Sequence, residues 1–155
     1  MSTTPTTPHR VITRRVVDWA AWDWGSAAFN AVATTFVFTT YLTSDGVFTD
    51  AGTASTWLSN GMTIAGLFIA LLAPITGQRA DRRGRGGVWL GWFTGAVVAC
   101  MLAMYFVHPE SVLGPQGALM LGIALLGLGN VFFEFASVNY NAMLNHLGEK
   151  EDRGK

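Results

Sequence analysis

Four long stretches of the chain contain no Asp, Glu, Lys or Arg, and they constrain its fold more than any other feature. They cover residues 24–44, 51–78, 86–109 and 111–133. About 20 apolar residues cross a bilayer as a helix, and a soluble protein rarely keeps four such stretches in succession. Half of the residues are hydrophobic and only 13% are charged, against about 25% in soluble domains. The sequence therefore predicts an integral membrane protein.

The predicted fold is all-α, with one transmembrane helix for each charge-free stretch. The four helices are predicted at about residues 16–42, 55–78, 87–107 and 116–144. The first is too long for the apolar core of a signal peptide, so we expect it to be retained. Residues 1–15 are rich in Ser, Thr and Pro and are predicted to be a disordered cytoplasmic tail. Residues 145–155 are predicted to be a second cytoplasmic tail or a truncated loop.

The distribution of basic residues predicts the orientation of the helices. All ten Lys and Arg lie before the first helix, between the second and third, or after the fourth. The other two loops carry charge only at Asp45, Asp50 and Glu110. By the positive-inside rule both termini are predicted to be cytoplasmic, and we expect the membrane to be the cell (inner) membrane.

Charge and cysteine content argue against several classes of function. The formal net charge is zero, so no nucleic-acid partner is predicted. Cys100 is the single cysteine, and His9, His108 and His146 are scattered along the chain. No metal site and no pair of nucleophile and base is evident in this pattern. We expect no enzyme activity, no metal and no cofactor.

Two of the predicted helices carry polar stripes. In the first, Asp23, Ser26, Asn30 and Thr34 are spaced by three, four and four residues, which places them on one helical face. Asp23 lies toward the cytoplasmic end of that helix. An ionisable group inside a membrane is costly, and it usually marks a functional site.

The fourth helix has a matching stripe of Asn130, Glu134, Ser137 and Asn141. Asp23 and Glu134 could face one cavity in its inner half, where a desolvated carboxylate can carry a proton or bind a cationic group. The candidate substrate-binding or proton-coupling residues are Asp23, Asn30, Asn130, Glu134 and Asn141. The alternative is that both stripes are interhelical contacts, with Asn, Ser and Thr bonding across helices.

Two further patterns concern packing and the membrane interface. Gly91 and Gly95 form a G-x-x-x-G pair, which predicts a close helix–helix contact. Aromatic residues near the proposed cytoplasmic ends are predicted to lie at the headgroup level, because one edge of each ring is polar. They are Trp19, Trp22, Trp24, Trp89, Trp92 and Tyr140.

The loop between the second and third predicted helices reads Gly-Gln-Arg-Ala-Asp-Arg-Arg-Gly-Arg. Pro74 and Gly77 are expected to end the second helix before this loop. The spacing resembles the signature of the major facilitator superfamily, which is Gly, three residues, Asp-Arg, one residue and Gly-Arg. The matching positions, a candidate conformational latch, are Gly77, Asp81, Arg82, Gly84 and Arg85.

A narrower resemblance appears at both ends of the helical region. Residues 18–29, Asp-Trp-Ala-Ala-Trp-Asp-Trp-Gly-Ser-Ala-Ala-Phe, resemble the opening helix of the vacuolar amino-acid effluxer-like family, also called the unknown major facilitator family. Residues 140–144, Tyr-Asn-Ala-Met-Leu, resemble the end of that family's fourth helix. The likeness covers the first third of the family's usual twelve helices.

The resemblance implies a fold, a mechanism and partners. The fold would be the first four helices of a major facilitator protein, with helices one and four lining the cavity and Asp81 and Arg85 in the latch. The function would be the N-terminal part of a secondary transporter that moves a small solute by alternating access. The chain is expected to be incomplete alone, so its partners are the lipid bilayer, the solute, and missing C-terminal helices or a partner subunit.

Other functions remain open from the sequence. A four-helix membrane scaffold or assembly subunit without transport activity is the main alternative. A compact four-helix exporter working as a dimer is a further one. The ten-to-zero split of basic residues between the two sides argues against the dual-topology kind of exporter.

Overall fold

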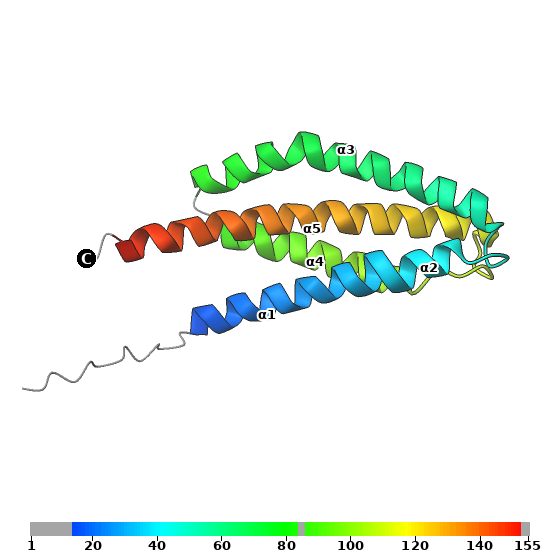
Figure 1. The fold of residues 1–155 in the computed structure, drawn as a ribbon, viewed down its shortest axis with the longest axis horizontal. Helices are drawn as coiled ribbons and strands as arrows, with labels where there is room; N and C mark the ends of the chain where they lie inside the picture. The colour runs from blue at the N-terminus through cyan, green and yellow to red at the C-terminus, as the bar shows by residue number, and fades with distance from the viewer. Residues whose placement is uncertain (1–13, 84–85, 153–155) are drawn as a thin grey trace, which may run out of the picture.

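The computed structural model describes residues 14–83 and 86–152, and every regular element in these two ranges is a helix. Figure 1 shows the helices lying side by side along one long axis. In chain order they are α1 (Arg14–Ala28), the π-helix η1 (Phe29–Val37), α2 (Phe38–Thr43), α3 (Ala51–Arg83), α4 (Gly86–Met104) and α5 (Gly114–Asp152).

Three helices of the described part are long and apolar enough to cross a membrane. Their apolar spans are Ala51–Thr76 of α3, Gly86–Met104 of α4 and Gly114–Ala142 of α5. The prediction of an all-helical chain with several candidate spans is thus confirmed for these residues. Residues 14–43 are helical throughout, but the run is divided among α1, η1 and α2.

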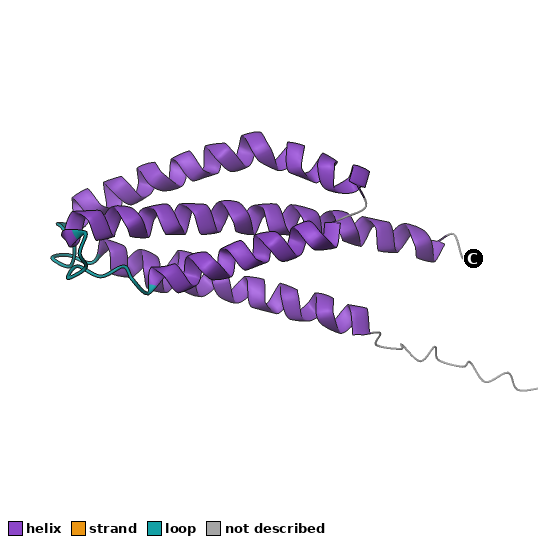
Figure 2. Cartoon of the chain, turned by 180° about the vertical axis from the view of Figure 1, so that it is seen from behind, coloured by secondary structure: helices purple, strands orange, loops and turns teal. Residues whose placement is uncertain are grey.

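Helix α5 is the centre of the bundle. It packs extensively against α3 and α4, and it meets the α1–η1–α2 run along a third side. Figures 1 and 2 show this arrangement from opposite sides. The loops 44–50 and 105–113 lie together at one end, which we call the loop end. The start of α1 and the end of α5 lie at the other, which we call the terminal end.

Helix α3 is longer than its sequence predicts. Pro74 and Gly77 were expected to end it, but α3 continues to Arg83 with Pro74 inside. Proline removes the donor to the carbonyl of Ala70, yet transmembrane helices tolerate this loss because neighbouring helices support the segment. The expectation that Pro74 and Gly77 end this helix at about residue 78 is therefore wrong.

Other helix ends also differ from their predicted positions. α4 ends at Met104, because Tyr105, Phe106 and Val107 form turns that bond back three residues. α5 continues past residue 144 to Asp152, into the predicted second tail. α1 begins at Arg14, and the rest of the predicted N-terminal tail lies outside the described residues.

Small residues set the close approach of α3 and α5. A Cβ atom on Gly61 would lie 2.3 Å from Cγ2 of Ile123. One turn along, a Cβ on Gly127 would lie 3.5 Å from the Cβ of Ala65. Close backbone approach through small residues is the usual way in which membrane helices associate, because lipid gives no hydrophobic drive between helices.

The predicted contact at Gly91 and Gly95 does not form within the chain. A Cβ atom on either glycine would meet nothing within 4 Å, and both residues are exposed. The prediction of a close packing site there is wrong for this chain by itself, since the tight crossing uses the glycines of α3 and α5 instead.

The buried core is concentrated at the loop end. Leu42 of α2, Leu58 of α3 and Leu126 of α5 belong to one buried cluster, which also takes in Phe48 from the first loop. The hydroxyl of Tyr41 adds a hydrogen bond of 3.2 Å to the carbonyl of Val107. The helices are therefore tied firmly at this end, and a second, smaller cluster lies farther toward the terminal end.

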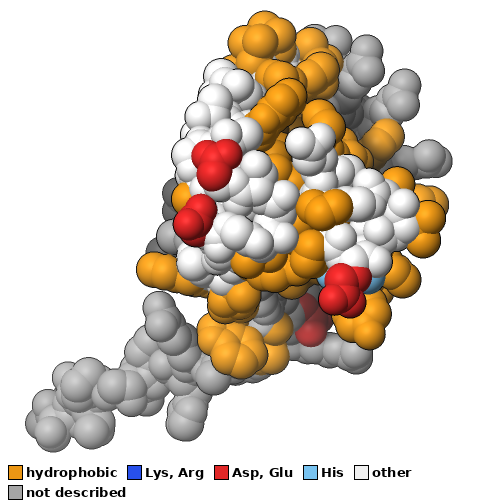
Figure 3. All heavy atoms as spheres, turned by 90° about the vertical axis from the view of Figure 1, so that its right-hand side faces the viewer, with side chains coloured by type: hydrophobic (Ala, Val, Ile, Leu, Met, Phe, Trp, Pro, Cys, Tyr) orange, Lys and Arg blue, Asp and Glu red, His pale blue; other side chains and the backbone are white. Residues whose placement is uncertain are grey.

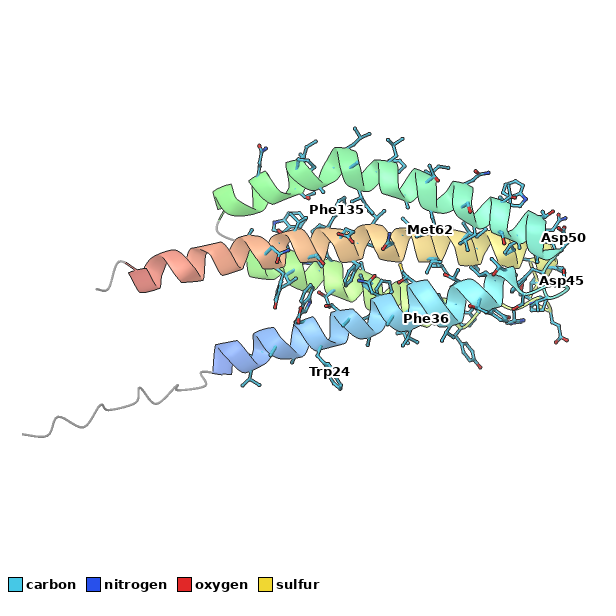
Figure 4. All side chains as sticks on the ribbon, viewed as in Figure 1. Trp24, Phe36, Asp45, Asp50, Met62 and Phe135 are labelled. Carbon is cyan, nitrogen blue, oxygen red and sulfur yellow. The ribbon has the colours of Figure 1, made fainter. Side chains whose placement is uncertain are left out.

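Two carboxylates of the first loop hold the start of α3. Asp50 Oδ1 accepts a hydrogen bond of 2.9 Å from the Thr53 N–H, and Asp45 Oδ1 accepts one of 3.1 Å from the Ala51 N–H. Negative charge there also complements the helix dipole. Figure 4 places both aspartates beside the start of α3, and Figure 3 looks onto this end, where acidic side chains are exposed.

Gly61→Leu should destabilise the bundle, because the branched Cβ of Ile123 has little freedom to move aside. Gly66→Leu is the matched control, since a Cβ on Gly66 would meet nothing within 4 Å. We expect Gly61→Leu to be less stable than Gly66→Leu by about 1–3 kcal/mol, the usual cost of overpacking. Unfolding of both variants in detergent micelles measures the difference, and equal stabilities would contradict the crossing.

Asp50 makes the start of α3 sensitive to acid. The hydrogen bonds from Thr53 lower the pKa of Asp50 below its ordinary value of 3.8. A carboxylate with a lowered folded-state pKa stabilises the fold above its ordinary pKa, and this contribution is lost as pH falls through the lowered value.

Asp50→Asn keeps a capping side chain but cannot ionise. We therefore expect wild type to have the higher Tm from neutral pH down to about pH 5, with the gap closing in stronger acid. Thermal unfolding across this pH series is the measurement, and a gap that does not change with pH would contradict the assignment.

Candidate functional site

Aromatic rings join α1 to α5 in the terminal half of the bundle. The Trp22 ring stacks on Tyr140, with centroids 4.2 Å apart and planes inclined by 25°. Phe29, at the start of η1, lies 5.3 Å from the ring of Phe133. In each segment the two contact residues are seven apart, which is two helical turns. These contacts define the line along which the two antiparallel segments face each other.

The residue after each contact residue is polar, and all of these residues lie on one side of the line. Asp23 and Asn30 follow Trp22 and Phe29, and Glu134 and Asn141 follow Phe133 and Tyr140. One residue along an α-helix is a rotation of about 100°. In two antiparallel helices that face each other, this rotation places the residue after each contact residue on the same side of the contact line.

Asn130 joins the same set. It follows Gly129, where a Cβ would lie 3.4 Å from Cζ of the Phe29 ring. We call the resulting surface the polar strip, and its members are Asp23, Asn30, Asn130, Glu134 and Asn141. These are the five residues that the two sequence stripes predict, and the contacts above bring them to one side of the α1–α5 pair.

The polar strip has two levels along the bundle. The first level, near the terminal end, holds Asp23 and Asn141, and the Asp23 carboxylate interacts electrostatically with the Tyr140 phenol. The second level holds Asn30, Asn130 and Glu134, whose chain neighbours Phe29, Gly129 and Phe133 lie in contact. Seven residues of helix separate the levels by about 10 Å. The two carboxylates thus share a side but lie at different depths.

Exposure differs between the levels. Asp23 and Asn141 at the first level are exposed, as is Asn30 at the second, while Asn130 and Glu134 are half-buried. The partial burial of Glu134 follows from its position on α5, the helix that is covered on three sides. Of the two carboxylates, Glu134 is therefore the more enclosed by protein.

Two hydroxyls of the first stripe bond within their own helix. Ser26 Oγ donates to the carbonyl of Asp23 at 2.7 Å. Thr34 Oγ1 donates to the carbonyl of Asn30 and lies 3.4 Å from its Oδ1. These bonds satisfy the hydroxyl donors of Ser26 and Thr34 within their own helical run.

The π-helix η1 changes the geometry of the first stripe. Its bonds reach back five residues, and the hydroxyl of Thr39 likewise donates to the carbonyl of Thr34. The prediction of a single face assumed 3.6 residues per turn. The wider π turn moves Thr34 off the helical face that carries Asp23. π segments are rare and often occur at functional sites.

Trp22 links three helices. Besides stacking on Tyr140, its Nε1–H donates a hydrogen bond of 3.2 Å to Thr94 Oγ1 of α4. The sequence predicts that Trp22 and Tyr140 lie at the lipid headgroups, and the structure adds that each ring faces the other helix. Trp24 is 83% exposed and points away from the bundle in Figure 4, as an interfacial tryptophan does.

Sequence reasoning missed one buried polar residue, Asn139. Its side chain is 1% exposed, and its Nδ2 donates to the carbonyl of Phe135 at 2.7 Å. Its Oδ1 is buried without a hydrogen-bond partner. Phe135, one turn earlier, packs edge-on against Phe93 of α4, so Asn139 faces away from the polar strip. The available signal in the sequence was its helical spacing from Phe132 and Phe135, which places all three residues on one face of the helix.

The predicted latch falls mostly outside what the structure describes. Gly77, Asp81 and Arg82 lie in the last turns of α3, but their side chains are not among those described. Gly84 and Arg85 lie outside the described residues. The latch therefore stays a prediction.

The polar strip offers carboxylate and amide groups and no ready metal site. Within residues 14–83 and 86–152 no three His, Cys, Asp or Glu residues come together as metal ligands would. The strip can accept hydrogen bonds, attract positive charge and take up a proton. No protein-family model, curated protein or solved structure matches this chain.

Trp22→Ala should loosen the terminal end of the bundle, because it removes the stack on Tyr140 and the bond to Thr94. We expect a loss of about 1–2 kcal/mol in unfolding free energy. Trp24→Ala is the matched control and should leave the stability unchanged, since Trp24 is 83% exposed. Unfolding in detergent micelles measures the stability of both variants. Equal losses would argue against a stabilising role for the contacts of Trp22 with Tyr140 and Thr94.

Proposed function

We propose that the chain is the N-terminal part of a secondary active transporter of the major facilitator superfamily, which moves a small solute by alternating access. The α1–η1–α2 run then serves as a fourth transmembrane span beside α3, α4 and α5. The polar strip lines the solute pathway. The observation that carries the proposal is the convergence of the predicted polar residues of two distant helices on one side of the bundle.

The energetic cost of the strip supports this role. A carboxylate near the centre of a membrane helix costs about 2.5–3.5 kcal/mol on insertion scales. Asp23 and Glu134 both lie in helices that run beside apolar spans. Such residues are rare in membrane proteins and usually face a water-filled pathway. A transport pathway accounts for two of them on one side.

The placement of charge supports an orientation with both termini in the cytoplasm of the cell (inner) membrane. Arg14 at the start of α1, Arg83 at the end of α3 and Lys150 in the last turns of α5 all lie toward the terminal end. The two loops at the loop end carry no Lys or Arg. The positive-inside rule then makes the terminal end cytoplasmic.

The loop motif supports the choice of superfamily. Gly77, Asp81, Arg82, Gly84 and Arg85 match its signature in spacing and residue type. In alternating access one helical repeat rocks against another around a site near the midplane. Asp81 and Arg85 would hold the cytoplasmic side closed against further helices, which belong to the same protein or to a partner subunit.

Glu134 is the group that we assign to proton coupling. It is the half-buried carboxylate of the strip and belongs to its deeper level, as Asn30 and Asn130 do. Asp23, exposed and nearer the cytoplasm, passes the proton between Glu134 and water.

A scaffold or assembly subunit without transport activity is the second candidate. The open face at Gly91 and Gly95 favours it, because small residues spaced by four let another helix approach closely. This role makes Asp23 and Glu134 dispensable. The two candidates therefore differ in what happens when a carboxylate of the strip is neutralised.

Glu134→Gln should abolish proton-coupled transport while leaving membrane insertion intact. The assay uses energised inverted membrane vesicles that contain the complete native protein, with a pH-sensitive dye that reports proton flux on addition of amino acids or small amines. Glu110→Gln is the matched control, because Glu110 is an exposed carboxylate of the loop end. Blotting of the membrane fraction checks that both variants insert.

We expect flux in wild type and Glu110→Gln and none above background in Glu134→Gln. Unchanged flux in Glu134→Gln would rule out the coupling role. Two results together would favour the scaffold. The vesicles would respond to no solute, and the protein would keep its cellular role when Asp23 and Glu134 are replaced by neutral residues.

A further inference from the structure

We propose that the loop 105–113 rests in the interfacial layer of the bilayer, among the lipid headgroups and the first carbons of the acyl chains. Four exposed apolar side chains make this contact, and we call them the apolar flanks of the loop. They are Tyr105 and Phe106 on one flank and Val112 and Leu113 on the other. The inference rests on the candidate spans of α4 and α5, and it does not depend on transport.

The rest of the bundle leaves the apolar flanks uncovered. Tyr105 is 84% exposed and Val112 is fully exposed, while Phe106 and Leu113 are each more than half exposed. Figure 3 shows hydrophobic side chains exposed beside the acidic ones at the loop end. A group of large apolar side chains left open on a surface usually marks a contact with a partner or a membrane.

Backbone hydrogen bonds fix the first flank in this exposed position. The N–H groups of Tyr105, Phe106 and Val107 donate to carbonyls three residues earlier, at 3.0–3.2 Å. Val107 is only 3% exposed, and its carbonyl accepts the hydrogen bond from the Tyr41 hydroxyl. Because Val107 packs into the bundle, the two aromatic residues before it are directed to the outside.

The depth of the flanks matches the interfacial layer. A bilayer core is about 30 Å thick and about 40–45 Å thick with its headgroups, so each interface spans about 5–8 Å. The span of α4 ends at Met104, and turns of this kind advance about 2 Å per residue. Tyr105 and Phe106 therefore lie about 2 and 4 Å beyond the span. Val112 and Leu113 directly precede the span of α5, at a distance of at most about 7 Å.

The neighbouring loop 44–50 is built in the opposite way. Its aromatic residue, Phe48, is 5% exposed and belongs to the buried cluster, while Asp45 and Asp50 are exposed. This is the pattern of a loop surrounded by water. Both loops lie at the same end of the bundle, so the difference indicates that the loop 105–113 meets a less polar environment.

The loop 105–113 also has a polar tip. His108 and Glu110 lie between the two flanks in sequence, and both are exposed. A tip in water with flanks in the interface satisfies both kinds of side chain. Tyr105 suits the boundary in particular, because its ring is apolar and its hydroxyl can reach water or a headgroup.

Continuity with the span of α4 favours lipid as the partner of the flanks. Leu102, one turn before Tyr105 and Phe106, is 69% exposed and lies within that span. Residues three and four apart share one face of a helix, and the turn that follows α4 extends this face. The apolar surface that the span presents outward therefore runs into the first flank without a polar break.

Site-specific fluorescence of the full chain in lipid nanodiscs tests the inference. In a Cys100→Ala background, Val112→Cys and Tyr105→Cys each carry the environment-sensitive label NBD. Glu110→Cys is the matched control, because it places the same label at the polar tip of the same loop. Each label is quenched by iodide, which stays in water, and by phosphatidylcholine with a nitroxide near the top of its acyl chain. Repeating the labelling with Cys100 in place, where this thiol is buried, checks that the background leaves the loop unchanged.

We expect the labels at Val112 and Tyr105 to emit at shorter wavelength than the label at Glu110. Nitroxide lipid should quench them more strongly than the control, and iodide should quench them less. Equal quenching at all three positions, or stronger iodide quenching on the flanks, would overturn the inference. Short-wavelength emission on the flanks without nitroxide quenching would mean that protein covers them, which would overturn the assignment to lipid.

Discussion

The arrangement of the bundle depends on how α5 divides its surface among three neighbours. Gly127 faces Ala65 of α3, Phe135 faces Phe93 of α4, and Phe133 faces Phe29 at the start of η1. Lipid offers no hydrophobic drive to bring helices together, so small residues and matched rings must hold these contacts by close packing. Because α5 is fixed on three sides, the direction in which Glu134 faces is fixed as well.

The same packing explains why polar residues that are far apart in sequence lie together. Trp22 and Phe29 repeat at the same interval as Phe133 and Tyr140, so the two antiparallel segments meet in register. The neighbours of these rings, Asp23 and Glu134 among them, then turn to one side. The apolar contacts thus determine the position of the polar groups, and a change in the ring contacts would displace both carboxylates.

Much of this was predictable from composition and spacing. Gaps between charged residues located the helices, and the i, i+4 and i, i+7 spacings predicted which polar residues share one helical face. The sequence did not reveal that Trp22 faces Tyr140, because a tryptophan near a helix end reads equally well as an interfacial residue. It also did not reveal the π turn at Phe29, which depends on tertiary packing and has no fixed residue pattern. Pro74 misled for a related reason, since its cost in water is relieved among membrane helices.

Pro74 divides α3 into two mechanical parts. The part before Pro74 packs closely against α5 at Gly61 and Ala65. Beyond Ala70 the helix lacks one backbone hydrogen bond, because the proline ring has no N–H to donate. The helix is therefore easier to bend at Pro74, and the last turns, which carry Gly77 and Asp81, lie beyond this point. Bending at Pro74 would therefore move these turns without changing the packing of Gly61 and Ala65 against α5.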